Sequence, residues 1–326
     1  MSMASNSAMG PFSLWIASTA SAKVRRVRKL DAPASLPYPA TFSEQEPVMS
    51  KWSFPTGDLM KGKRGVVMGV ANDSSIAWGI AQQLAAQGAE IAFTYQGENL
   101  ERRVRPLVES IGMDTMISAD VTDDASMDAA FAEVKAKWGK IDFLVHSIAF
   151  AGKEELQGSM VANTTREGFR RAMDISVYSF IDCARRASEI MPPREEGGGS
   201  IVCMTYLGAE RTVPSYNVMG VAKAALEAST RYAARDLGAK GIRVNAISAG
   251  AMRTLSLAGI RGGKGLMSTG RDWSLLKEDT SMEGVAGCAL YLLSPIGRSI
   301  TGEVVHVDAG FHVVGVPDIQ ESSAAT

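Results

Sequence analysis

Short β-branched, apolar runs alternate with helical patterns from Lys61 onward, and this alternation restricts the chain to one class of fold. The runs lie at residues 65–70, 90–95, 115–120, 141–147, 200–205, 242–248 and 303–308. Between the first two, "SIAWGIAQQLAAQG" (75–88) places Ile76, Ile80 and Leu84 four residues apart, as on one face of a helix. Strands that alternate with helices predict βαβ units, and nearly continuous apolar strands predict burial on both faces of a parallel sheet. We therefore expect an α/β fold: one doubly wound (Rossmann) domain at 56–315, with a seven-stranded parallel sheet and helices on both faces, and a C-terminal tail at 316–326.

Residues 1–55 differ in composition from the rest of the chain. They are rich in Ser, Ala and Pro, hold five basic residues between Lys23 and Lys29, and contain no acid before Asp31. We expect this extension to be disordered, because it cannot build a core. Its apolar stretch precedes its charges, which argues against a secretory signal. An organellar transit peptide and an over-extended reading frame, with a natural start at Met49, both stay open.

Charge and cysteine usage exclude several partners. The formal net charge is −1, so we expect no nucleic-acid partner and no anionic membrane surface. No apolar run approaches the roughly 20 residues that a membrane span needs. The scattered Cys183, Cys203 and Cys288 are expected to be buried small hydrophobes in a reducing compartment, which favours a cytoplasmic location. The three histidines lack metal-ligand spacing, and we expect no metal.

The ends of the first two strands carry a possible dinucleotide site, because a doubly wound sheet binds its ligand at the carboxyl ends of its strands. After the first strand, "GVANDSSIAWG" offers Gly69 for a tight turn, Ser74 or Ser75 as a helix cap, and Ile76 at the start of the helix. This is the place of a pyrophosphate turn, although without G-x-G-x-x-G an ordinary βα turn stays possible. After the second strand, Gln96 stands where an NAD site usually has an acid.

The next two strand ends add to the pattern. Asp120 and Val121 could flank an adenine, and Ser147 and Ile148 could line the ribose and nicotinamide. Each signal is weak alone, but their recurrence at successive strand ends predicts a dinucleotide site. The nearby pair Arg102–Arg103 is better explained as the solvated face of a helix.

The segment "SYNVMGVAKAALEAS" (215–229) places Tyr216 and Lys223 on one face of an expected helix. Met219 and Gly220 lie between them, and Gly220 permits a close approach to the backbone. The ordinary interpretation is a core helix whose Tyr and Lys reach toward solvent. The alternative is a catalytic pair.

Several segments together resemble one family. They are "GVANDSSIAWGIA", "AFTYQGE", "VHSIAF", "TREGF", "YLGAERTVPSYNVMGVAKAALEAS", "GIRVNAISAG" and "GEVVHVDAGF". In order and spacing over residues 61–312, the chain resembles bacterial-type NADH-dependent enoyl-acyl-carrier-protein reductases, a divergent group of short-chain dehydrogenases/reductases. Plant plastid relatives carry a longer glycine loop than this chain, which weakens the transit-peptide interpretation.

The resemblance implies reduction of the trans-2 double bond of enoyl thioesters by NADH in fatty acid biosynthesis. It implies that Tyr216 points at the thioester carbonyl, that Tyr206 is a second pocket tyrosine, and that Lys223 holds the nicotinamide ribose. Met219 and Ile260 are then expected to line the substrate pocket. Acyl carrier protein is the implied partner, and the implied assembly is a homotetramer.

Further positions follow from the same resemblance. Ile247 is expected beside the nicotinamide carboxamide, Thr254 near the phosphates, and residues 251–270 as a mobile flap over the acyl chain. The chain departs from the family pattern at Ala251, where Pro is common, in the flap segment "RGGKGLM", and in the longer loop "PPREEGGGS". These departures concern chain-length preference and inhibitor affinity.

Two rival functions remain at this point. A β-ketoacyl or other carbonyl reductase is disfavoured because its usual Tyr-x-x-x-Lys would place the tyrosine at Met219, whereas this chain has Tyr-x6-Lys. A non-catalytic dinucleotide-binding protein is disfavoured because Tyr206, Tyr216 and Lys223 are all present.

Overall fold

The computed structural model describes residues 51–260 and 262–316, and most of the expected extension and tail lies outside these ranges. Residues 51–55 are described, and they contact the core. Trp52 and Phe54 pack against it, and the side-chain amides of Gln83 and Gln87 donate to the carbonyl of Pro55 at 3.1 and 2.7 Å. Contacts with the domain therefore begin a few residues before the expected boundary at residue 55.

The expected seven-stranded parallel sheet is confirmed. Its strands are β1 (Arg64–Met68), β2 (Glu90–Tyr95), β3 (Met116–Ser118), β4 (Phe143–His146), β5 (Ser200–Thr205), β6 (Arg243–Ala249) and β7 (Val304–Val307). They run parallel in the order β3-β2-β1-β4-β5-β6-β7. The order reverses between β1 and β4, so the carboxyl ends of these two strands form the switch point of the sheet.

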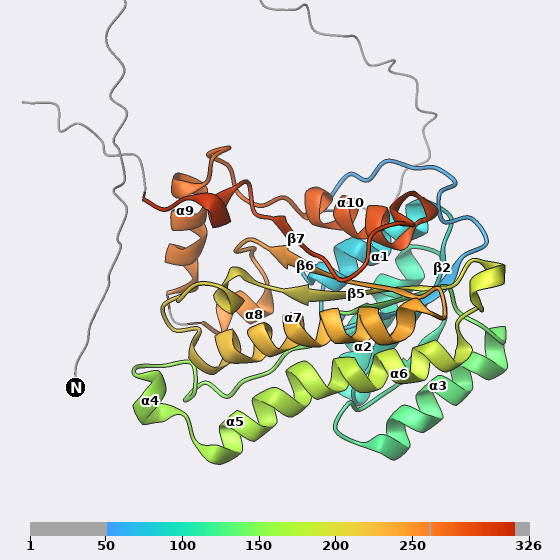
Figure 1. Cartoon of the computed structure of the whole chain (residues 1–326), viewed down its shortest axis with the longest axis horizontal. Coiled ribbons are helices and arrows are strands. Elements are labelled where there is room, and N and C mark those ends of the chain that lie inside the picture. Colours follow the sequence, from blue (N-terminus) through green and yellow to red (C-terminus); the bar gives the residue numbers. More distant parts are fainter. Residues whose placement is uncertain (1–50, 261, 317–326) are drawn as a thin grey trace, which may run out of the picture. The chain divides into compact units, whose positions relative to one another are not determined.

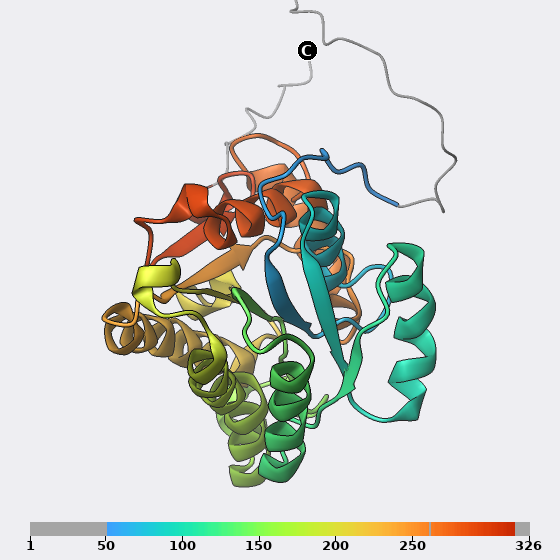
Figure 2. The same ribbon diagram turned by 90° about the vertical axis from the view of Figure 1, so that its right-hand side faces the viewer.

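Helices cover both faces of the sheet (Figures 1 and 2). They are α1 (Ile76–Ala86), α2 (Glu98–Ser110), α3 (Asp124–Trp138), α4 (Met160–Asn163), α5 (Arg166–Met173), α6 (Ser179–Ile190), α7 (Asn217–Gly238), α8 (Leu255–Ala258), α9 (Gly263–Trp273) and α10 (Met282–Leu293). A π-helical turn, η1 (Asp174–Tyr178), joins α5 to α6, and short 3₁₀ turns are η2 (Arg194–Glu196), η3 (Leu207–Ala209), η4 (Pro295–Gly297) and η5 (Phe311–Val313).

The core is divided by the sheet into two apolar clusters. Val67 of β1 packs with α1, α2 and α10, whereas its neighbours Val66 and Met68 pack with α3, α6 and α7. This alternation follows from the two-residue period of a strand. Gly79 on α1 permits the close packing of that layer, since a Cβ there would lie 2.3 Å from the Met282 sulfur of α10. No helix in the described residues is both long and apolar enough to cross a bilayer.

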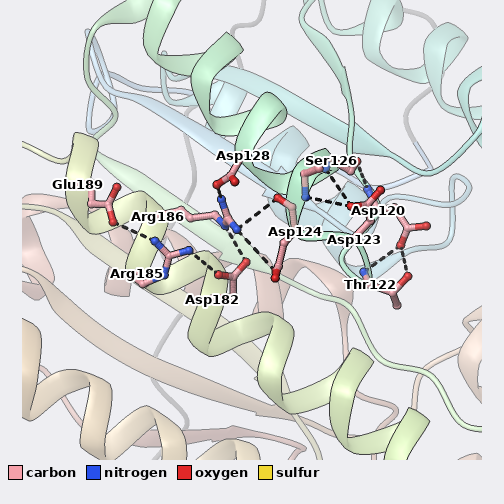
Figure 3. Close-up of polar contacts among 11 residues, drawn as sticks. Asp120, Thr122, Asp123, Asp124, Ser126, Asp128, Asp182, Arg185, Arg186 and Glu189 are labelled. Carbon is pink, nitrogen blue, oxygen red and sulfur yellow. Dashed lines mark hydrogen bonds and ion pairs between the residues drawn. The ribbon is translucent and has the colours of Figure 1, made fainter.

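A charged network fastens α3 to α6 on the second face (Figure 3). The Arg186 guanidinium, only 6% exposed, donates from Nε to Asp182 at 2.7 Å and also pairs with Asp124 and Asp128. Arg185 donates to the other Asp182 oxygen at 2.8 Å. Arg186 and Asp182 are both buried and form the centre of this network, which supplies each of them with a counter-charge.

Candidate active site

The ends of β1 and β4 lie against each other at the switch point. Gly69 has a φ of +98°, and a Cβ there would lie 2.1 Å from the Ser147 carbonyl oxygen. Only glycine suits both the backbone conformation and this close approach. Two residues predicted to bind the cofactor, Gly69 and Ser147, are therefore brought together, and Ile148 follows partly buried.

Ser75 stands at the start of α1, but it does not cap the helix as we expected. Its hydroxyl instead accepts from the amides of Ala71 and Asn72 at 3.0 and 3.1 Å and donates to the Asn72 side chain. The side chain makes no bond to the first amides of α1, where Ile76 begins the helix. This terminus therefore keeps amide donors available for an anion, which fits a pyrophosphate.

The predicted residues after β2 and β3 are joined by a hydrogen bond. Gln96 donates from Nε2 to Asp120 at 2.8 Å, and Thr122 donates to the other Asp120 oxygen from its amide and its hydroxyl. Partial burial raises the pKa of Asp120, but these hydrogen bonds outweigh it and the pKa lies below its ordinary value. Val121 packs at the edge of the core. Gln96 and Asp120 thus present carboxylate and amide groups near the expected adenosine end.

The pair Arg102–Arg103 does not join this site. Both residues are exposed on α2, and Arg102 pairs with Glu98 at 3.1 Å within the same helix. The interpretation of this pair as a solvated helix face is confirmed.

Tyr206 and Tyr216 form the centre of the predicted substrate pocket. Their ring centroids lie 5.0 Å apart with an interplanar angle of 67°, an edge-to-face contact. Tyr216 is 8% exposed and Tyr206 partly buried. Within the described residues neither hydroxyl has a hydrogen-bond partner, so both phenols are available to a ligand. Burial raises the pKa of both, and the charge of Asp308 adds to the rise at Tyr206, so both phenols keep their protons near neutral pH.

Two glycines make room for the tyrosine pair. A Cβ on Gly208, in η3, would lie 2.3 Å from the ring of Tyr216. A Cβ on Gly220 would lie 2.8 Å from the Gly208 carbonyl oxygen. The close approach expected at Gly220 is therefore confirmed, and the approaching group is the backbone of η3. The helix itself begins at Asn217, so Tyr216 lies at its N-cap position and not within it, which corrects the helix expected from residue 215.

Lys223 is buried on α7, at 6% exposure, and does not reach toward solvent. Its Nζ donates to the Met204 carbonyl at the end of β5 over 2.7 Å. Burial lowers the pKa of Lys223 to about 8, against opposing effects of Cys203 and Glu227. An ammonium has three donors, so two remain for a ligand. The ordinary interpretation of a solvent-directed Lys is therefore wrong.

The remaining predicted pocket residues gather around the tyrosines. Met219 is buried in one apolar cluster with Tyr216, and Ile260 packs against that cluster. Ile247 is buried in β6, and Thr254 caps α8 by accepting from the Leu257 amide at 3.2 Å.

The expected flap, 251–270, contains α8 and the first part of α9. Together with the ends of β6 and β7, α9 encloses a cavity of about 10 Å³ beside Tyr206, which has room for about one water. Of the expected mobile flap residues, Arg261 lies outside the described residues.

Sequence reasoning missed several polar groups around this site. Ser176, fully buried in the π-helical turn η1, accepts from the Phe150 amide at 3.0 Å and donates back to its carbonyl at 3.3 Å. It thereby fixes the segment that follows Ser147 and Ile148. His146, also buried, bonds Ser179 at 2.9 Å, and burial together with the charge of Lys223 lowers its pKa to about 3. The segment "DIS" at 174–176 carries no motif, so its π-helical turn is a feature of the structure that the sequence pattern does not predict.

The cysteines take no part in the site chemistry. Cys183 and Cys203 are buried, as expected, and Cys288 is partly buried. Burial raises the pKa of Cys203 and of Cys288 to about 11, so both stay protonated. No group of His, Cys, Asp or Glu in 51–260 and 262–316 is arranged to hold a metal.

A doubly wound sheet with a glycine turn at its switch point, and a tyrosine and lysine beside the ends of β5 and β6, defines a dinucleotide-dependent oxidoreductase of the short-chain dehydrogenase/reductase type. The family model of the enoyl-(acyl carrier protein) reductases matches residues 69–312. The chain belongs to this family, and the resemblance found in the sequence is confirmed.

Individual relatives agree with this assignment. An NADH enoyl-[acyl-carrier-protein] reductase of Rhizobium meliloti is 54% identical over 266 residues, which cover 80% of this chain and 96% of the relative. The solved structure of the Anaplasma phagocytophilum enoyl-(acyl-carrier-protein) reductase with NAD has a TM-score of 0.77 at 50% identity, covering 82% of this chain and 100% of its own. The Bacillus cereus enzyme, solved with NADP⁺ and an indole naphthyridinone, has a TM-score of 0.76 at 46% identity, covering 79% and 100%.

Proposed function

We propose that this protein reduces the trans-2 double bond of enoyl-acyl-carrier-protein thioesters with NADH, in the elongation cycle of fatty acid biosynthesis. Family membership supports the reaction class. The observation that carries the proposal is the pair of contacting phenols, Tyr216 buried and Tyr206 partly buried, with the buried Lys223 about two turns further along α7. This arrangement suits a substrate on whose carbonyl oxygen negative charge develops.

Each side chain has a distinct role in this proposal. The Tyr216 hydroxyl donates to the thioester oxygen and stabilises its developing charge, as an oxyanion hole does. Tyr206 packs edge-on against Tyr216 and fixes its ring. Lys223 holds ribose hydroxyls with its two remaining donors and provides a positive charge. Met219 and Ile260 offer an apolar wall to the acyl chain.

The residues present fit a bound dinucleotide. The uncapped start of α1 suits the pyrophosphate, Gly69 and Ser147 shape the switch point, and Gln96 with Asp120 offers hydrogen bonds to the adenosine half. Bound NADH supplies the hydride that reaches the β-carbon of the substrate. The protein orients the two reactants.

The direct test is NADH oxidation with crotonyl thioester against acetoacetyl thioester. We expect turnover with the crotonyl substrate only. Preferential use of the acetoacetyl substrate would instead support a carbonyl reductase, and tight NADH binding without turnover of either would support a non-catalytic protein.

NADH is expected to be preferred over NADPH. Gln96 carries no positive charge, and Arg102 pairs with Glu98 on an exposed helix, so the end of β2 offers a 2′-phosphate a neutral amide and not a guanidinium. Steady-state kcat/KM for both cofactors measures this preference, and a tenfold advantage for NADPH would contradict it.

We also propose that acyl carrier protein delivers the substrate and that the chain forms a homotetramer. Exposed apolar side chains support an assembly: Tyr178 and Ile181 on η1 and α6 and Tyr232 on the adjacent α7 lie on one face of the sheet, and Tyr291 on α10 lies on the other. The edge strand β7, whose residues are all partly exposed, supports a second contact. Light scattering is the test, and a stable monomer at micromolar concentration would refute the tetramer.

A cytoplasmic location is proposed on the basis of three free thiols, which suit a reducing compartment. A fluorescent fusion of the full chain, compared with one that starts at Met49, tests this. Organellar import that depends on residues 1–48 would favour the transit-peptide alternative.

A further inference from the structure

A line of polar side chains joins α7 to β5 directly beneath the predicted site. Lys223, Glu227 and Thr230 lie on one face of α7, four and three residues apart, and all three are buried. They contact three successive residues of β5. Thr230 lies 3.3 Å from the Cys203 sulfur, Lys223 donates to the Met204 carbonyl, and Glu227 accepts from the Thr205 hydroxyl at 2.7 Å. Glu227 lies within the segment 215–229, but the pattern of that segment gives it no role.

We propose that Glu227 is a positioning residue, which keeps Lys223 in its charged form by lying one helical turn away as a buried carboxylate. The inference rests on the proposed function, in that Lys223 is taken as the ribose ligand. A buried ammonium without a counter-charge loses its proton readily, and an opposite charge within one helical turn favours the charged form.

The other groups that face Lys223 cannot provide this charge near neutral pH. His146 on β4 is neutral, because burial holds its pKa near 3. Cys203 on β5 is a neutral thiol, because burial raises its pKa to about 11. Tyr216 keeps its proton because burial raises its pKa. Among the described residues that affect the pKa of Lys223, Glu227 is therefore the one that can carry a negative charge at pH 7.

The surroundings of Glu227 hold its carboxylate in place. The pKa of Glu227 lies above its ordinary value because burial raises it, as does the nearby Glu210, while the hydrogen bond from Thr205 and the nearby His306 of β7 and Arg231 of α7 lower it in part. His306 itself bonds Glu210 at 2.8 Å, which leaves Glu210 partly compensated. The Thr205 hydroxyl points at Glu227 immediately before Tyr206, so the same carboxylate also fixes the end of β5.

The test compares two variants that separate charge from hydrogen bonding. Glu227→Gln keeps an oxygen that can accept from Thr205 but removes the charge. Thr205→Val removes the hydrogen bond but leaves the ionisable carboxyl group in place. The dissociation constant of NADH is measured by fluorescence from pH 6 to 10 in the wild-type protein and in both variants, with circular dichroism as a check on folding.

In the wild-type protein we expect NADH affinity to fall as pH rises through about 8, where Lys223 loses its proton. In Glu227→Gln this decline should begin about 1 to 2 pH units lower. The dissociation constant should then rise about tenfold near pH 7.5–8, with a change below about twofold at pH 6. Thr205→Val should keep the wild-type midpoint.

If the pH midpoint of NADH binding does not shift in Glu227→Gln, the inference is overturned. An equal shift in Thr205→Val would also overturn it, because Glu227 would then be merely structural. If Glu227→Gln does not fold, Glu227→Asp replaces it. Its shorter side chain withdraws the carboxylate, so the pH midpoint should shift less but in the same direction. An unshifted midpoint would again overturn the inference. NADH binding is measured without an enoyl substrate. Absence of crotonyl turnover would therefore contradict the proposed function alone, and an unshifted midpoint of NADH binding would contradict this inference alone.

Discussion

Replacing Tyr216 by Phe isolates one hydroxyl, because the edge-to-face packing on Tyr206 and the burial of the ring stay the same. The hydroxyl has no protein partner in the described residues, so its removal leaves no donor or acceptor unsatisfied. We therefore expect a melting temperature within about 2 °C of the wild-type value.

The expected loss lies in catalysis. One oxyanion donor is worth up to about 1000-fold in kcat, and a ribose hydroxyl close by can take over part of its role. We expect kcat and kcat/KM to fall together by about 10- to 1000-fold, with the NADH dissociation constant changed less than about twofold. Steady-state NADH oxidation with crotonyl thioester and fluorescence titration measure the two quantities.

The pH profile adds a second criterion. Burial raises the pKa of Tyr216 far above neutral, so this phenol stays a donor across the accessible range. The alkaline limb of kcat/KM should therefore come from Lys223, near pH 8, and should stay in place in Tyr216→Phe. A variant that loses this limb, or that weakens NADH while turnover of bound substrate is unchanged, would refute the assigned roles.

Lys223→Met should raise the free energy of unfolding by on the order of 3 kcal/mol at pH 7, because the buried ammonium has a pKa of about 8 against 10.5 in the unfolded chain. Denaturation measured at several pH values should show this gain disappear between pH 8 and 10.5. Arg186→Leu should lower the free energy of unfolding by about 3 kcal/mol, because it leaves the buried Asp182 with a weaker partner. Calorimetry should show a Tm about 6 °C lower, and an unchanged Tm would contradict this prediction. Gly69→Ala should weaken NADH binding more than about tenfold, because its Cβ would meet the neighbouring strand end; wild-type titration curves would argue against it. A chain that starts at Met49 should keep kcat and Tm, and a fall of more than about 5 °C would mean that the removed residues pack on the domain.

The sequence was sufficient to predict the sheet, because strands buried on both faces leave long apolar runs. All seven runs became strands, and the general rule for doubly wound sheets placed Gly69 and Ser147 at one edge. The tyrosines and Lys223 came from the family resemblance, and the structure brings them together.

Other features could not be predicted, because they depend on geometry between segments. The Ser75 hydroxyl turns back to the preceding loop and not toward α1, which the residue type does not decide. The contact of Glu227 with Thr205 requires the register between α7 and β5, and 22 residues separate them. Ser176 likewise acts on Phe150 across 26 residues, from a turn with no sequence signature.

The π-helical turn between α5 and α6 makes this part of the molecule sensitive to the length of the chain. Its hydrogen bonds span five residues where those of an α-helix span four, and Ser176 faces Phe150 from within it. Deleting a single residue from 174–178 would let α5, the turn and α6 merge into one regular helix, and α5 would rotate by roughly 100° relative to α6. Side chains of α5 that now face the domain would then point to solvent. We therefore expect homologous chains to vary in residue type within 174–178 but to keep its length, so that insertions and deletions accumulate elsewhere, as in the longer loop before β5.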